Sequence, residues 1–285
     1  GADMAILEMT DTYLRWLLLF SPAFILNDVF LCFVRNDENP QLAMTAMLTG
    51  SFANIILDYV FIFPMRMGIF GAIFATGLSP VISIAMMAPH WGKKKNSFHF
   101  VKTGIDKESV QCNISLGFPS LVAQVSSGIV MIIFNAIILK LKGNTGVAAY
   151  GIIANISLVI VAVYTGIAQG IQPLVSRFYA EENRRQTQTV LRYAMTTMLA
   201  LSCVIYLCIF VFTQPIIAAF NSENHAELQQ IAISGLRLYF ISIPFVGYNI
   251  ILATFFTSIE KAVPAHILSV LRGFILIIPL AFLLS

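Results

Sequence analysis

The sequence predicts an all-α polytopic membrane protein with about eight transmembrane helices. Hydrophobic residues make up 58% of the 285 residues, charged residues only 11%, and the mean hydropathy is +0.83. A soluble domain carries about 25% charged residues, so this composition excludes an ordinary soluble protein. Apolar runs of about 20 residues, the length that crosses a bilayer as a helix, recur along the whole chain.

The expected spans follow one another with short polar breaks. We place them at 12–34, 43–65, 67–90, 112–139, 146–172, 190–212, 230–258 and 264–285. The turn between the second and third spans is predicted at Pro64-Met65-Arg66-Met67-Gly68. The spans that begin at 112 and 230 are longer than a bilayer requires, which indicates tilt or extension into the interface.

The distribution of Lys and Arg between alternate loops predicts the orientation. One set of loops holds most of these residues, whereas the opposite set carries only Arg66, Lys140 and Lys142. Loops rich in Lys and Arg face the cytoplasm. The turn at 64–68 is therefore expected to face outward, in a multi-pass protein of the cytoplasmic membrane.

One long basic stretch, residues 91–111, is expected to be a cytoplasmic linker. It separates residues 1–90 from residues 112–285, which we expect to belong to two different helical bundles. The net charge of the chain is only +3, and we expect no nucleic-acid partner. We expect the helices to contact membrane lipid.

The sequence lacks the short motifs of common enzymes. It has no GxSxG, no HExxH and no phosphate-binding glycine loop. The four cysteines, which form no CxxC pair, are expected to be small buried hydrophobic residues. We therefore predict a protein that is not an enzyme and has no cofactor.

Asp58 is a lone carboxylate inside an apolar span, where a charge costs several kcal/mol or is neutralised. Asn54, four residues earlier, shares its helix face. Thr76 lies as far after the turn centre at Met67 as Asp58 lies before it, so both are expected about 13 Å from the turn. These oxygen-bearing groups predict a site for H⁺ or a small hard cation such as Na⁺. The alternative is that Asp58 only hydrogen-bonds a neighbouring helix.

Three further polar residues lie inside later spans. Gln124 and Asn135 are candidates to face a central substrate cavity, with packing between helices as the alternative. Arg272 is expected to extend to the cytoplasmic face or to cap a neighbouring helix.

Several segments, in order along nearly the whole chain, resemble the MATE family of multidrug and toxic-compound extrusion transporters. They are RNDENPQLAM (35–44), NIILDYVFIFP (54–64), GIFGAIFAT (68–76), GFPSLVAQ (117–124), VAAYGI (147–152), QGIQPLVSRFYAEEN (169–183) and SVLRGFILIIPL (269–280). One departure is visible, because the family usually has Gly-Ala where this chain has Ala180-Glu181.

The resemblance implies a twelve-helix, two-bundle fold, of which this chain resembles helices four to eleven and is truncated at both ends. Residues 1–90 would be the second half of the N-terminal bundle, and residues 112–285 the C-terminal bundle without its last helix. Asp58, Asn54 and Thr76 match the family's cation site on helices five and six, whose helix-one carboxylate lies outside this chain. Asn27 is similar to a helix-four amide that lines the drug chamber.

The resemblance also implies the function. We expect a cation-coupled antiporter, driven by H⁺ or Na⁺, that exports cationic amphipathic drugs or metabolites and acts as a monomer. Two alternatives stay open: a flippase for lipid-linked oligosaccharide from the same superfamily, and a non-transporting membrane scaffold or decayed gene product.

Overall fold

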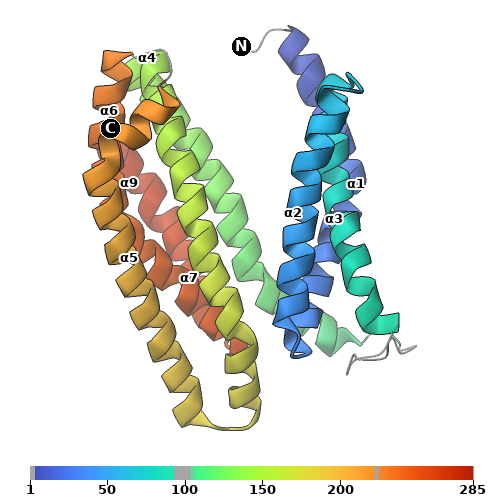
Figure 1. Ribbon diagram of the computed structural model, residues 1–285. Coiled ribbons are helices and arrows are strands. Elements are labelled where there is room, and N and C mark those ends of the chain that lie inside the picture. Colours follow the sequence, from blue (N-terminus) through green and yellow to red (C-terminus); the bar gives the residue numbers. More distant parts are fainter. Residues whose placement is uncertain (1–3, 93–103, 105, 222–224, 285) are drawn as a thin grey trace. The chain divides into compact units, whose positions relative to one another are not determined.

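The structure is a computed structural model that describes residues 4–92, 104, 106–221 and 225–284 (Figure 1). These described residues form helices and turns and contain no strand. The chain divides into two compact units, residues 1–103 (unit 1) and residues 104–285 (unit 2), and each is described by itself. Most of the predicted basic linker, including Lys93, Lys94 and Lys95, lies outside the described residues.

Unit 1 consists of three helices, α1 (Met4–Asn36), α2 (Pro40–Ile62) and α3 (Gly68–Gly92). Each of them contacts the other two, and α2 and α3 lie side by side along much of their length (Figure 1). Asn39 begins α2 by accepting a hydrogen bond from the backbone N–H of Leu42 at 3.2 Å, and Pro40 occupies the first helical position. Both choices are typical of helix N-termini.

The predicted turn between the second and third spans is confirmed. α2 ends at Ile62 and α3 begins at Gly68. The chain reverses through left-handed backbone angles at Arg66 (φ 50°) and Gly68 (φ 58°). The N–H groups of Met65 and Met67 donate to the carbonyls of Val60 and Phe61, at 3.1 and 2.9 Å, which satisfies the end of α2.

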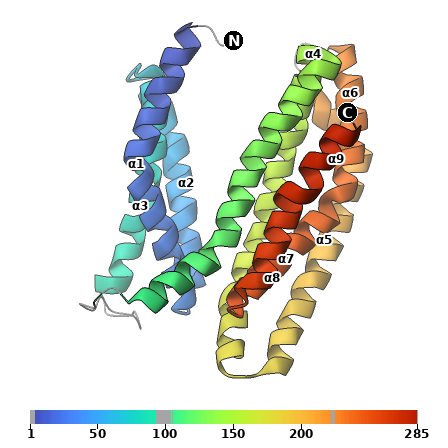
Figure 2. The same cartoon turned by 180° about the vertical axis from the view of Figure 1, so that it is seen from behind.

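Unit 2 begins with one long helical segment, α4 (Lys107–Ala180), that contains two of the predicted spans. Gly143 interrupts it with φ 63° and ψ −157°, so that the chain turns back on itself (Figure 2). The stacked rings of Phe134 and Tyr150, 5.8 Å apart, bring the two arms together on either side of Gly143. α4 is therefore a helical hairpin.

The rest of unit 2 continues as packed helices. These are α5 (Arg184–Phe220), α6 (Ala226–Tyr239), the short 3₁₀ turn η1 (Phe240–Ser242), α7 (Ile243–Ser258), α8 (Ala262–Val270), the π-helical turn η2 (Leu271–Leu276) and α9 (Ile277–Leu284). α6, η1 and α7 form one bent span, and α8, η2 and α9 form another that packs against the first arm of α4 (Figure 2).

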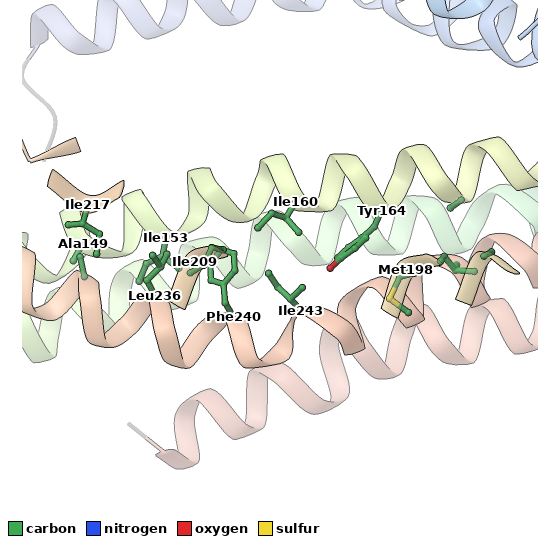
Figure 3. Close-up of a cluster of buried hydrophobic side chains, with 14 residues drawn as sticks. Ala149, Ile153, Ile160, Tyr164, Met198, Ile209, Ile217, Leu236, Phe240 and Ile243 are labelled. Atoms are coloured by element: carbon green, nitrogen blue, oxygen red, sulfur yellow. The ribbon is translucent and has the colours of Figure 1, made fainter. Parts of the chain in front are cut away.

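The core of unit 2 is an apolar column between α4, α5, α6 and α7 (Figure 3). Tyr164, Met198 and Phe240 are fully buried in it. The hydroxyl groups of Tyr164 and Ser202 share a hydrogen bond of 2.6 Å, and Ser202 also donates to the carbonyl of Met198 at 2.7 Å. The polar atoms in this core are therefore paired, as burial requires.

The surfaces of both units carry apolar side chains. Leu18, Ile55 and Leu207 are 62%, 64% and 66% exposed, and many other large hydrophobic residues are similar. Seven helical segments among the described residues are long and apolar enough to cross a membrane, with the α4 hairpin counted as one. Together with the break at Gly143, this confirms a polytopic helical membrane fold of about eight spans.

The prediction that the cysteines are buried is wrong. Cys32, Cys112, Cys203 and Cys208 are free and exposed. In a membrane helix an apolar residue can face lipid as readily as the core, so an apolar neighbourhood in the sequence does not predict burial.

Candidate functional site

The candidate cation site begins with two buried polar atoms on one face of α2. Asn54 and Asp58 are half-buried residues four positions apart. The Nδ2 atom of Asn54 and the Oδ1 atom of Asp58 are shielded from solvent and have no hydrogen-bond partner among the described residues. Since most buried polar atoms in proteins are paired, two unpaired atoms on adjacent turns indicate capacity for a ligand or for water.

Two close contacts between α2 and α3 bracket these residues. Near the turn, a Cβ added to Gly71 would lie 2.9 Å from the Cβ of Phe61. Farther from the turn, Ser79 donates a hydrogen bond to the carbonyl of Gly50 at 2.9 Å. Asn54 and Asp58 lie between these two contacts on α2.

Thr76 lies between the same two contacts on α3, at positions 71 and 79. Its hydroxyl donates to the carbonyl of Ala72 at 2.9 Å, within its own helix. A hydroxyl oxygen that donates one bond keeps lone pairs that can accept another or coordinate a cation. Thr76 is thus placed at the level of Asn54 and Asp58, with acceptor capacity left.

An aromatic cluster in unit 1 reaches from the turn-proximal end of α3 to the level of Thr76. The ring of Phe74 lies 5.9, 5.6 and 5.8 Å from the rings of Phe20, Phe61 and Phe70. Trp16 contacts Phe70 edge to face at 5.0 Å. These rings make the inside of unit 1 apolar close to Thr76 along α3, and apolar surroundings strengthen electrostatic interactions.

Asn27 contributes a third buried and unpaired atom. Its Oδ1 has no hydrogen-bond partner among the described residues. Asn27 lies on α1 between Phe20 and Phe30, whose rings contact Phe74 and Trp91 of α3. The prediction that Asn27 faces a substrate stays a prediction.

Ser83 is a polar residue that the sequence analysis missed. It lies on α3 between Phe74 and Trp91, is 3% exposed, and its Oγ has no hydrogen-bond partner in the described part of the chain. The available signal was the small residues Gly71, Ala75, Ser79 and Ser83, spaced four apart along α3. Such a stripe allows a neighbouring helix to approach closely.

The other two predicted substrate residues lie in unit 2. Gln124 is exposed on the first arm of α4, and Asn135 is half-buried on the same arm beside the Phe134–Tyr150 stack. The site residues are therefore divided, with Asn27, Asn54, Asp58 and Thr76 in unit 1. That Gln124 and Asn135 line a substrate cavity stays a prediction.

The chemistry available in unit 1 is that of one carboxylate with amide and hydroxyl neighbours. Among the described residues, no three His, Cys, Asp or Glu side chains gather into a metal-binding group. A carboxylate with neutral oxygen donors suits a proton or a weakly held hard cation. Hydrolytic chemistry would instead need a nucleophile and a base in contact.

These features define a multi-pass α-helical membrane protein with unpaired polar groups inside a helical unit. The sequence matches the MatE family over residues 1–60 and 119–283, which is more than half of its length. The chain belongs to the MatE family.

Named relatives agree with this assignment. The chain is 24% identical to the multidrug export protein MepA of Staphylococcus saprophyticus, an alignment that covers 100% of this chain and 62% of MepA. It is also 24% identical to MepA of Staphylococcus haemolyticus, over 98% of this chain and 61% of the relative. The chain thus spans less than two thirds of these relatives. Their names describe export proteins and not enzymes.

Solved structures share the fold. A transporter of the MOP superfamily from Pyrococcus furiosus, described as having a binding pocket of reversed polarity, superimposes with a TM-score of 0.92 at 24% identity, over 99% of this chain and 64% of that one. An outward-facing multidrug resistance MATE transporter gives a TM-score of 0.88 at 24% identity, over 96% and 62%.

Proposed function

We propose that the protein is a cation-coupled antiporter that exports cationic amphipathic compounds across the cytoplasmic membrane. Membership of the MatE family and the multidrug export names of the relatives support the transport of small molecules. The observation that carries the coupling role is the buried, unpaired Oδ1 atom of Asp58 beside the unpaired Nδ2 atom of Asn54.

The proposed coupling ion is H⁺ or Na⁺, bound at Asp58. A buried carboxylate oxygen without a partner is costly, and a proton or a cation would satisfy it. Thr76 would add a hydroxyl oxygen, because its donated bond to Ala72 leaves lone pairs available. Asn54 would add an amide oxygen from the same face of α2.

Coupling follows if cation binding changes the packing of α2 against its neighbours. Neutralising Asp58 removes the charge that disfavours an apolar environment, so the conformation that excludes water from the site becomes more stable. Export is then driven when the bound cation and the bound substrate favour different conformations. We expect the protein to act as a monomer in this cycle.

The test replaces Asp58 by Asn in the full-length protein reconstituted into liposomes. Asp58→Asn keeps the size of the side chain but cannot take up or release a proton, so gradient-driven ethidium export should fall to the level of protein-free liposomes. The matched control is Asp28→Asn, which removes an exposed carboxylate from α1. Undiminished export by Asp58→Asn would refute the coupling role.

A second measurement identifies the ion. Export driven by a pH gradient in sodium-free choline buffer indicates H⁺, whereas export that requires an inward Na⁺ gradient at equal pH indicates Na⁺. Asn54→Ala and Thr76→Ala should raise the ion concentration that gives half-maximal export. Each removes a neutral oxygen donor but leaves the carboxylate.

A further inference from the structure

Arg272 is a half-buried charged residue in the last span of unit 2, which consists of α8, η2 and α9. Ten residues (272 − 262) separate it from Ala262, the first residue of α8, which is about 15 Å of helix at 1.5 Å per residue. The hydrocarbon core of a bilayer is about 30 Å thick. Arg272 is therefore close to the middle of its span, where charged residues are costly and usually functional.

The backbone around Arg272 is held against α4. Arg272 lies in the π-helical turn η2, a rare conformation that is frequent at functional sites. Gly273 is buried, and a Cβ added there would lie 2.6 Å from the Cβ of Ser126. This contact fixes η2 against the first arm of α4 and so restricts the direction of the half-buried side chain of Arg272.

One tyrosine residue, Tyr239, lies near Arg272. The hydroxyl of Tyr239 is close enough to Arg272 for the two groups to interact electrostatically, and Tyr150 is similarly close to Tyr239. Tyr239 also shares a hydrogen bond of 3.2 Å with Ser157. Arg272 is thus near one tyrosine side chain of unit 2.

Arg272 has no acidic partner in this part of the molecule. Among the described residues no hydrogen bond, ion pair or ring contact occupies its side chain. The sequence of unit 2 contains Asp and Glu only at 106, 108, 181, 182, 223, 227 and 260. Those among the described residues, which exclude position 223, lie at helix ends or in turns.

Arg237 shows the contrasting case in the same unit. Its guanidinium lies 4.7 Å from the centre of the Phe210 ring, and its Nε donates to the hydroxyl of Thr213 at 3.4 Å. A ring face and a hydroxyl therefore occupy Arg237, whereas the donors of Arg272 are left for another group.

A guanidinium group presents a planar fork of N–H donors that matches the paired oxygens of a carboxylate or a phosphate. We propose that Arg272, with Tyr239 beside it, binds the anionic oxygen group, carboxylate or phosphate, of an amphipathic ligand within unit 2. Arg272 and Tyr239 belong to unit 2, whereas Asp58 belongs to unit 1, and the proposal does not depend on the proposed transport reaction. The anionic group can come from a soluble amphiphile or from a lipid headgroup.

The experiment measures equilibrium binding to the full-length protein in phosphatidylcholine nanodiscs, without any ion gradient. The probes are the fluorescent carboxylate 11-(dansylamino)undecanoic acid and its uncharged methyl ester. The wild-type protein should bind the acid about ten-fold or more tightly than the ester, since a charge-assisted, bidentate pair discriminates by this order. Arg272→Gln should reduce this ratio to about one.

Three variants separate binding from folding. Arg192→Gln removes a positive charge from an exposed position on α5 and should keep the wild-type ratio. Arg272→Lys keeps the charge without the planar fork, so its ratio should fall between those of the wild type and Arg272→Gln. Tyr239→Phe should weaken binding of the acid more than binding of the ester. Thermal melting of each variant identifies any that fail to fold.

The source of the anionic group is found by competition. Nanodiscs that contain phosphatidylglycerol should displace the acid if a lipid headgroup occupies the site, and should leave its binding unchanged if the ligand is soluble. Equal binding of acid and ester by the wild type would overturn the proposal. So would an unchanged ratio in a folded Arg272→Gln or Arg272→Lys variant.

Discussion

His90 and Asp37 form a buried contact in unit 1, with the Nε2 atom of His90 2.6 Å from the Oδ2 atom of Asp37. Their side chains are only 3% and 4% exposed. Asp37 directly follows α1 and His90 is in the last turns of α3, so the contact joins two segments that are 53 positions apart in the sequence. It fixes the end of α3 to the turn between α1 and α2.

Breaking this contact should destabilise the protein strongly. Asp37→Ala leaves the buried His90 without its carboxylate, and loss of one partner of a buried pair costs about 3–5 kcal/mol of unfolding free energy. The double variant Asp37→Ala/His90→Ala should lose less unfolding free energy than the two single variants lose when their losses are added. Thermal melting of the purified protein measures all three.

The matched control is Asp11→Ala, which breaks an exposed ion pair with Arg15 on α1. The side chains of Arg15 and Asp11 are 77% and 53% exposed, so this loss should stay below about 1 kcal/mol. Equal melting temperatures for the Asp37 and Asp11 variants would show that the buried contact stabilises the protein no more than the exposed ion pair does.

Glu182 adopts the left-handed backbone conformation, with φ 55°, in the turn between α4 and α5. This conformation costs a residue with a side chain about 1–2 kcal/mol, and glycine adopts it freely. Glu182→Gly should therefore raise the unfolding free energy. The gain should be at most about 1 kcal/mol, because glycine also increases the entropy of the unfolded chain, which offsets part of it. Gln188→Gly, inside α5, should lower it by about 1 kcal/mol. A lower melting temperature for Glu182→Gly would contradict this account.

Gly50 allows α2 to approach α3. A Cβ at this position would lie 3.0 Å from the carbonyl oxygen of Ser79 and 3.2 Å from the Cβ of Ser83. Gly50→Ala should push the helices apart, weaken the bond from Ser79 and cost about 1–3 kcal/mol. The same change at Gly128 of α4 meets nothing within 4 Å and should be neutral or stabilising. Similar melting temperatures for Gly50→Ala and Gly128→Ala would argue against a tight contact between α2 and α3 at Gly50.

Asp106 caps the N-terminus of α4. Hydrogen bonds from the hydroxyl and then the backbone N–H of Ser109 hold the pKa of this carboxyl below its ordinary value of 3.8. A lowered pKa means that the ionised form stabilises the folded cap above the unfolded pKa, and that this stabilisation disappears as the pH falls through the folded pKa.

Hydrogen exchange of the first turn of α4, corrected for the intrinsic rate at each pH, tests this cap. Protection should be high at about pH 6 and lower at about pH 2.5 in the wild type. Asp106→Ala should give the same weak protection at both values. A wild-type first turn that is equally protected at both values would show that the carboxylate does not stabilise it.

The spans could be predicted because each depends on local composition and length. The α2–α3 turn agrees with the prediction to within two residues at each side, and the two arms of the α4 hairpin on either side of Gly143 contain two predicted spans. The His90–Asp37 contact could not be predicted, because it depends on how α3 is placed along its neighbours. The burial of Ser83 was missed, although the stripe of small residues on α3 indicated a close helix contact. The burial of the cysteines was predicted wrongly, because apolar residues are favoured both on the lipid-facing surface and in the core of a membrane protein.

The α2–α3 hairpin has a consequence for the synthesis of the protein. Its two close contacts, at Gly71 and at Gly50, involve only residues between Pro40 and Gly92. The hairpin can therefore close as soon as this stretch has left the ribosome, before α4 is complete. Asp58 then enters the bilayer already covered by a partner helix, so that the insertion machinery does not need to place a lone carboxylate helix in lipid.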